Sequence, residues 1–186
     1  MSEREPATVD RIELFLRQLG QRYRGAGRIY LVGGTQMVLA GFRRQTDDID
    51  YVVRLEHDDG DFISAVRSLI RDLNLSVESA GKGDFIPLPA GWEERSPFIA
   101  RYGRLDAFAF DPVSTSLAKI ERGAARDTQD VLALVHSGIV DLETLRAALD
   151  EIAPRLEHES IRVDERDFRR KFEAFVLLAK PEWGAT

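Results

Sequence analysis

Hydrophobic positions along the first third of the chain follow two periods, one typical of helices and one of strands. Apolar residues recur every three or four positions over 8–23, which predicts an amphipathic helix. A short apolar run predicts a strand at 28–32, and a helix over 34–42 and a second strand over 47–54 follow. Another helix is expected from residue 59 or 60 to about residue 72. The pattern therefore alternates helices with strands.

The pattern is weaker over the next forty residues. Residues 75–78 look like a strand, a Gly-Lys-Gly turn occupies 81–83, and prolines make a loop over 87–97. Residues 101–110 read as a strand or one arm of a hairpin, and from Val113 onward the pattern is helical. Breaks in the helical part are expected at Gly123, at Ser137 and Gly138, and at Pro154.

These elements predict an α+β fold. A mixed sheet with flanking helices is expected over residues 1–111, followed by a helical C-terminal region over 112–186 packed on that core. A chain of 186 residues is long enough to bury such a core.

Composition narrows the function classes. The chain has no cysteine, which excludes a disulfide framework, a thiolate zinc site and a cysteine nucleophile. No apolar run reaches the roughly 20 residues that span a bilayer, and the first residues lack the features of a signal peptide. We therefore expect a cytoplasmic protein without a membrane partner. Arginines outnumber lysines 22 to four; a GC-rich genome explains that bias, so an arginine is informative only where its position is unusual.

Two aspartates interrupt an otherwise apolar strand. Asp48 and Asp50 lie two positions apart in Asp-Ile-Asp-Tyr-Val-Val. Successive strand side chains point to opposite faces, so both carboxylates share one face while Ile49 packs on the other. Neighbouring carboxylates repel each other unless a cation lies between them, and Mg²⁺ binds carboxylate oxygens together with substrate phosphates. The pattern indicates a divalent-metal site.

Two glycines precede this pair along the chain. Gly33 and Gly34 lie where the predicted strand turns into the predicted helix. Glycines at such a turn let backbone N–H groups approach an anion closely, and the helix N-terminus adds partial positive charge. A phosphate site one short helix away from a metal-binding pair indicates nucleotide chemistry. The alternative is a tight turn followed by an acidic strand end.

These residues resemble the signature of the nucleotidyltransferase superfamily of polymerase-β-like fold. That signature is an apolar residue, Gly, Gly or Ser, a spacer, and then Asp-apolar-Asp/Glu-apolar. The chain has Val-Gly-Gly at 32–34, a spacer of 13 residues, and Asp-Ile-Asp-Tyr at 48–51. Thr46 adds the Thr-x-Asp-x-Asp form that is frequent in the superfamily. The resemblance implies a polymerase-β-like core with Mg²⁺ or Mn²⁺ on Asp48 and Asp50, and nucleotide contacts from Gly33, Gly34, Thr35 and Thr46.

A two-metal site needs a third carboxylate on a neighbouring strand. Asp106 is the best placed candidate, because it lies in the middle of an apolar segment where an unpaired charge would be costly to bury. The alternative is an edge-strand aspartate that faces water or pairs with an arginine such as Arg101.

A second constellation follows in the helical region. Residues 117–131 resemble the Lys-x-x-(Ala/Arg)…Arg-Asp-x-x-Asp-apolar motif of the AbiEii-like branch, which contains toxin nucleotidyltransferases. Lys119 and Arg122 share one helix face, and Asp127 and Asp130 repeat their spacing. The resemblance implies that Lys119 and Arg122 contact the nucleotide, and that Asp127 or Asp130 acts as a ligand, a base or an orienting group. The alternatives are that Asp127 caps a helix and that Asp130 pairs with Arg126.

Together the two motifs imply a metal-dependent enzyme that transfers a nucleoside monophosphate from an NTP to an acceptor hydroxyl. Asp48, Asp50, Asp106 and Lys119 would form its catalytic set. The AbiEii-like motif further implies a tRNA 3′ end as acceptor, a role as the toxin of a toxin–antitoxin system, and a cognate antitoxin as partner. The alternatives are transfer to a protein or to a small molecule such as an antibiotic, and a non-catalytic relative that only binds nucleotide.

Overall fold

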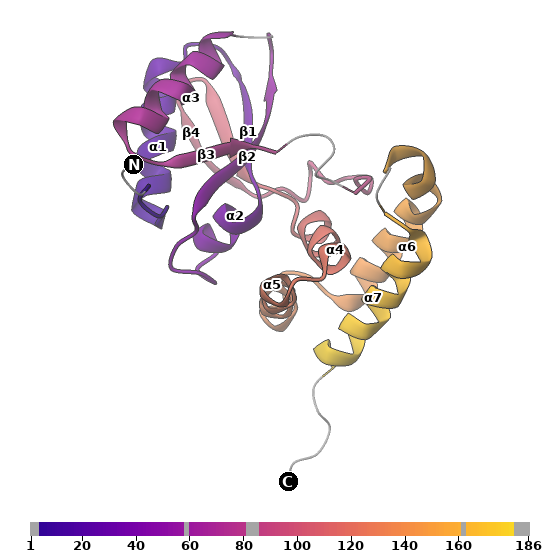
Figure 1. Ribbon diagram of the computed structural model, residues 1–186. Coiled ribbons are helices and arrows are strands. Elements are labelled where there is room, and N and C mark those ends of the chain that lie inside the picture. Colours follow the sequence, from indigo (N-terminus) through magenta and orange to yellow (C-terminus); the bar gives the residue numbers. More distant parts are fainter. Residues whose placement is uncertain (1–3, 58–59, 81–85, 161–162, 181–186) are drawn as a thin grey trace. The chain divides into compact units, whose positions relative to one another are not determined.

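The protein is described by a computed structural model and divides into two compact units (Figure 1). The structure describes residues 4–57, 60–80, 86–160 and 163–180. The first unit comprises Met1–Gly81 and Ser96–Phe110, and the second comprises Lys82–Arg95 and Asp111–Thr186. The turn expected at 81–83 lies outside the described residues. No helix in the described ranges is both long and apolar enough to cross a membrane.

A five-stranded mixed sheet forms the centre of the first unit, with the strand order β3-β2-β1-β5-β4. β1 (Gly27–Leu31) pairs antiparallel with β2 (Asp48–Leu55) and parallel with β5 (Leu105–Ala109). At the edges, β3 (Ser76–Ser79) pairs parallel with β2, and β4 (Phe98–Tyr102) pairs antiparallel with β5. The segment 101–110, read as a strand or hairpin arm, covers the end of β4, the turn and all of β5, and the predicted α+β class is confirmed.

One face of the sheet is covered by α1 (Val9–Arg22) and α3 (Gly60–Asp72), which lie on the same side of the strands (Figure 1). Both helices are amphipathic and turn their apolar residues toward the sheet. Strand residues at alternate positions complete this core, because side chains on a strand alternate between its two faces. These strand residues are Ile29, Leu31, Ile49, Tyr51, Leu105 and Ala107. The sheet's other face carries the residues between them.

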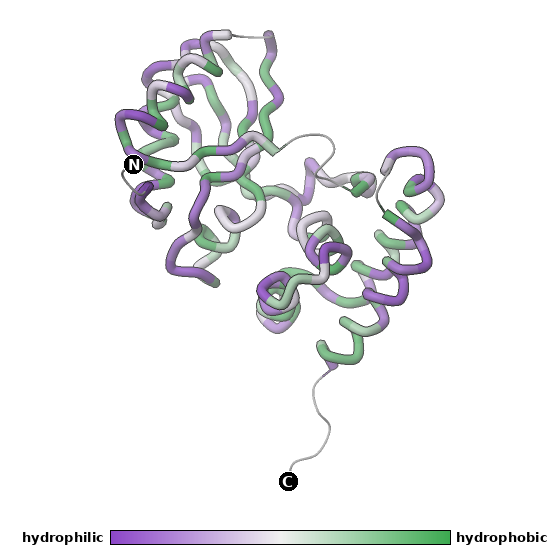
Figure 2. The backbone as a smooth tube through the Cα atoms, in the orientation of Figure 1, coloured by the Kyte–Doolittle hydropathy of each residue, from purple (hydrophilic) through white to green (hydrophobic). Residues whose placement is uncertain are grey.

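The second unit is helical. It contains α4 (Pro112–Arg122), α5 (Ala125–His136), α6 (Leu142–Glu159) and α7 (Glu165–Ala179), and each alternates between hydrophobic and hydrophilic positions (Figure 2). The break expected at Gly123 is confirmed, because this residue ends α4 with a φ of 70°. Glycine adopts this left-handed conformation with little steric cost. The break expected at Ser137 and Gly138 is confirmed in the same way at the end of α5.

The break expected at Pro154 is wrong, because α6 runs through this residue. Proline removes one backbone hydrogen bond and crowds the preceding turn, which usually ends a helix. In α6, Pro154 is exposed, while Ile152, Ala153 and Leu156 around it are buried. The apolar packing of these neighbours therefore holds the helix together across the lost hydrogen bond.

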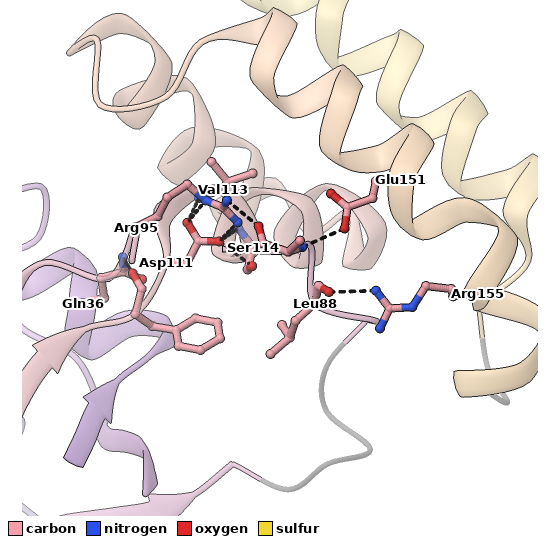
Figure 3. A network of polar contacts seen from close by, with 10 residues as sticks. Gln36, Leu88, Arg95, Asp111, Val113, Ser114, Glu151 and Arg155 are labelled. Carbon is pink, nitrogen blue, oxygen red and sulfur yellow. Dashed lines mark hydrogen bonds and ion pairs between the residues drawn. The ribbon is translucent and has the colours of Figure 1, made fainter. Parts of the chain in front are cut away.

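Residues 86–95 belong to the helical unit, to which polar contacts attach them (Figure 3). Arg95 makes two hydrogen bonds of 3.0 and 2.8 Å to the carboxylate of Asp111, which is fully buried. The same carboxylate caps α4 by accepting hydrogen bonds from the backbone N–H groups of residues 113 and 114. Farther along, Glu151 accepts from the backbone N–H of Ala90, and Arg155 donates to the carbonyl of Leu88.

Candidate functional site

The glycine turn of the first unit lies directly against the strand that carries the two aspartates. Gly33 has a φ of 59°, and a Cβ added there would lie 2.9 Å from Oδ2 of Asp50. A Cβ on Gly34 would lie 2.3 Å from the hydroxyl oxygen of Thr46. A side chain at Gly33 would strain the backbone and displace the Asp50 carboxylate, and one at Gly34 would displace the Thr46 side chain. Because no side chain intervenes, the backbone of the glycine turn can approach a ligand as closely as it approaches Asp50.

Asp48 and Asp50 begin β2 and lie on the face turned away from α1 and α3. Both are half-buried, whereas Ile49 between them is fully buried in the core. The strand alternation inferred from the sequence is thus the one observed. The carboxylates lie on one face at the end of the strand beside the glycine turn.

Thr35 joins the turn to this strand. Its hydroxyl donates to the carbonyl oxygen of Asp48 over 3.2 Å and accepts from the backbone N–H of Asp50 over 2.9 Å. The backbone N–H of Val32 also donates to the Asp50 carbonyl, over 3.0 Å. Thr35 is fully buried. Its observed contacts fix the position of the two aspartates, and the nucleotide contact expected of it stays a prediction.

A positive charge lies at the glycine turn. One guanidinium nitrogen of Arg43 is 3.3 Å from the place where a Cβ of Gly34 would lie. From the sequence, contact of Arg43 and Arg44 with a triphosphate or an RNA backbone is about as well supported as a solvated helix end. Only the folding of the segment after α2 (Gly33–Leu39) brings Arg43 to the turn.

A cavity of about 660 Å³ opens beside Asp48. It lies within the range of about 300–1,000 Å³ that small-molecule sites occupy. The N-terminal segment forms one wall, since Ala7 exchanges two backbone hydrogen bonds with Thr46, of 2.8 and 3.0 Å. The residues that line it are Arg4, Glu5, Pro6, Gln45, Asp47, Asp48 and Ser76, all but Pro6 polar or charged.

The carboxylates beside the glycine turn fit a magnesium ion that is held partly by the protein and partly by its substrate. Mg²⁺ commonly takes one or two carboxylates and completes its octahedron with water and substrate phosphates. Asp48 and Asp50 supply two such carboxylates on one face. No group of three His, Cys, Asp or Glu side chains that could hold a metal ion occurs among the described residues. A site formed by the protein alone, from three carboxylates, is therefore not assembled.

Asp106 lies away from this pair. Strand register places Asp106 beside Arg28, and Arg28 beside Arg54, which is four residues beyond Asp50 on β2. Four strand residues span about 13 Å. Asp106 instead makes two hydrogen bonds to Arg101, of 2.6 and 2.9 Å, and these bonds hold its pKa below the usual value. The structure thus shows the arginine pairing that was the alternative, and it does not bring Asp106 to the predicted metal site.

The motif of the helical region forms a buried charge network. The amine of Lys119 lies 2.9 Å from Asp127 and 2.6 Å from Asp130, and its side chain is only 3% exposed. Arg122 adds two hydrogen bonds to Asp127, of 2.7 and 2.8 Å. Burial alone would raise the pKa of Asp127, but hydrogen bonds from Arg122 and Lys119 lower it overall. The four residues are brought together as their spacing suggested, and their contact with a nucleotide stays a prediction.

The structure gives the two aspartates of this motif other positions than a helix cap, and it pairs Asp130 with a lysine. α5 begins after Ala124, so Asp127 lies inside its first turn and is not the capping residue. Asp130 contacts Lys119 of the preceding helix. The sequence placed these side chains on neighbouring helices, but only the packing of α4 against α5 shows that they neutralise one another.

Comparison with known proteins agrees with this geometry at the level of the superfamily. Residues 9–178 match the model of a family described as "Nucleotidyltransferase of unknown function (DUF6036)". No match was found among curated proteins or solved structures. The match supports the nucleotidyltransferase superfamily but not the AbiEii-like branch. Since it spans nearly the whole chain, the protein belongs to this family of nucleotidyltransferases of unknown function.

Proposed function

We propose that the protein transfers a nucleoside monophosphate from an NTP to an acceptor hydroxyl, with Mg²⁺ or Mn²⁺ as cofactor. The observation that supports this most is the contact between the glycine turn and the aspartates. Gly33 approaches the carboxylate of Asp50 so closely that a methyl group would not fit between them. Phosphates held at the turn would therefore lie next to a metal ion held by Asp48 and Asp50.

In this proposal the protein's residues act by binding and positioning. Backbone N–H groups at Gly33 and Gly34, with the Arg43 guanidinium, would hold the β- and γ-phosphates. Asp48 and Asp50 would hold the cation, and bound Mg²⁺ would supply charge stabilisation at the α-phosphate. The acceptor oxygen forms a bond to the α-phosphorus while the bond from the α-phosphorus to the bridging oxygen breaks. Pyrophosphate leaves, and the proton of the hydroxyl passes to solvent.

For the acceptor, we propose a tRNA 3′ end, with the protein acting as a toxin that a cognate antitoxin inhibits. The support for this is the resemblance of residues 117–131 to the AbiEii-like motif. A protein hydroxyl or a small molecule is the competing acceptor, and the cavity of about 660 Å³ next to Asp48 is large enough for a small molecule. A non-catalytic nucleotide-binding role is the remaining alternative.

The test is incubation of the purified protein with each α-³²P-labelled NTP, Mg²⁺ and total tRNA, in parallel with a reaction containing EDTA. Label on tRNA is expected only with metal, and Asp48→Ala or Asp50→Asn should lower transfer more than about 100-fold, as loss of a charge-stabilising group does. Asp10→Asn, at an exposed position in the first turn of α1, is the matched charge control. Label on protein instead of RNA would reassign the acceptor. Transfer that persists in Asp50→Asn would contradict the proposed site.

A further inference from the structure

The sheet face turned away from α1 and α3 has a second feature besides Asp48 and Asp50. Along β2, the residues on this face are Asp48, Asp50, Val52 and Arg54, because side chains alternate. At the Arg54 end, arginines and aromatic rings from four adjacent strands gather on this face. We call this the arginine–aromatic face, and it consists of Arg28, Arg54, Phe98, Arg101 and Phe108.

Aromatic rings on this face contact one another in a row. Tyr30 and Phe108 stack with ring centres 5.3 Å apart and planes 24° apart. Phe98 meets Phe108 edge-on, with centres 5.5 Å apart. Phe98 is 58% exposed, although burial of a phenylalanine is strongly favoured. The row therefore ends in a ring that is available to a ligand.

Arginines line the same face at a single level of the sheet. The register places Arg54 beside Arg28 and Arg28 beside Asp106, and Asp106 pairs with Arg101. Three positive charges and one negative charge thus cross four strands, in a chain whose net charge is −6. Arg28 and Arg54 are exposed, and the Arg101 side chain is 68% exposed. The Arg28 guanidinium also lies 5.8 Å from the centre of the Phe108 ring.

An irregularity in β4 puts Phe98 and Arg101 on this face. Phe98 pairs with Phe108 and Arg101 with Asp106, so three residues of β4 span two residues of β5. In a regular strand, residues three apart point to opposite faces, and a bulge of one residue returns them to the same face. Ile99 and Tyr102, in turn, pack against the core. The arrangement of Phe98 and Arg101 is therefore a product of the bulge.

We propose that the arginine–aromatic face binds single-stranded nucleic acid and guides it toward Asp48 and Asp50. Every base has a flat face that can stack on an exposed ring, and arginines neutralise phosphates. Single strands fit better than duplexes, because their bases are free to stack on the protein. The inference rests on the proposed function, since it gives the acceptor a path: Arg54 and Asp50 share one face of β2, about 13 Å apart.

The test measures binding of a fluorescent 12-nucleotide RNA, and of the DNA of the same sequence, by anisotropy over a range of salt concentrations. The double variant Arg28→Gln/Arg54→Gln is expected to weaken binding about tenfold at 0.15 M salt. The slope of log K against log salt concentration should become shallower by about 1.4, which corresponds to the loss of two phosphate contacts on a single strand. Phe98→Ala removes a stacking ring and should weaken binding about 5- to 150-fold, with little change in the salt slope. Comparison of RNA with DNA shows whether the 2′-hydroxyl contributes.

Arg67→Gln/Arg71→Gln is the matched control, because both arginines are exposed on α3, the helix that covers the opposite face. It removes the same charge and should leave binding unchanged. Equal weakening in both double variants would reduce the effect to general charge attraction and overturn the proposal, as would absence of oligonucleotide binding by the wild type. Asp48→Ala should bind the RNA normally. RNA binding without nucleotidyl transfer in the wild type would count against the enzymatic proposal alone. Nucleotidyl transfer without RNA binding on the arginine–aromatic face would count against the binding proposal alone.

Discussion

Replacement of Lys119 by methionine tests the buried charge network of the helical unit. Lys119 bridges Asp127 and Asp130, and all three side chains are at least 92% buried. Lys119→Met keeps most of the side-chain length but removes the charge that both carboxylates face. Arg122 still pairs with Asp127, but its own side chain is 62% exposed. Asp130 thus loses its Lys119 partner in a buried position.

The expected cost is large. Removal of one partner from a buried ion pair typically costs about 3–5 kcal/mol, because it leaves a buried charge without compensation. Domains are stable by only about 5–15 kcal/mol, so the loss is a substantial share of the free energy of unfolding. The same change at an exposed pair would cost about 0–1 kcal/mol. The magnitude itself thus tells whether the network is buried as the structure describes it.

The free energy of unfolding should depend on pH differently in the wild type and in Lys119→Met. In the wild type, the pKa of Asp127 is lowered in the folded state, so its stabilisation is present above the unfolded pKa of about 3.9 and is lost as pH falls through the folded pKa. In Lys119→Met, burial still raises the pKa of Asp127, while the hydrogen bond from Lys119 that lowers it is lost. The variant should therefore recover stability relative to the wild type between pH 7 and pH 5, where the wild-type contribution is still intact.

Urea unfolding followed by circular dichroism at pH 7 and pH 5 measures both effects. The control is the triple variant Lys119→Met/Asp127→Asn/Asp130→Asn, which removes the charges together and should be more stable than Lys119→Met at pH 7. A loss below about 1 kcal/mol in Lys119→Met, or a deficit that does not shrink at pH 5, would refute the reasoning.

Three further predictions follow from individual positions. Gly33→Ala should lower stability in a thermal melt by about 1–2 kcal/mol and abolish NTP binding, because the φ of Gly33 is 59° and the added Cβ would meet Asp50. Gly41→Ala is the control, since Gly41 has a φ of 80° but no atom within 4 Å of an added Cβ. It should lose stability to the same extent but keep NTP binding. Asp106→Asn should retain nucleotidyl transfer in the labelled-NTP assay. If this variant lost as much transfer activity as Asp50→Asn, Asp106 would have to be counted among the metal ligands after all. Pro154→Ala should raise the free energy of urea unfolding by about 1–2 kcal/mol, since it restores a hydrogen bond inside α6, and no gain would mean that the helix is distorted there.

Local sequence was sufficient to predict most elements of the first unit. The helix period over 8–23 and the strand period over 47–54 depend on side chains a few positions apart, and α1 and β2 lie within one residue of these bounds. Pro154 shows the limit of local reasoning. Its effect on a helix depends on whether the residues around it are buried, and their burial is decided by helices elsewhere in the chain.

The sequence by itself determined the nucleotidyltransferase superfamily, the sheet-and-helix class and the face shared by Asp48 and Asp50, because these depend on spacing along one strand and on a short motif. Only the tertiary structure decided which distant side chains meet. Strand register separates Asp106 from the aspartate pair and joins it to Arg101. Chain folding after α2 brings Arg43 to the glycine turn. Such contacts depend on strand order, register and a bulge, which a residue's sequence neighbours do not encode.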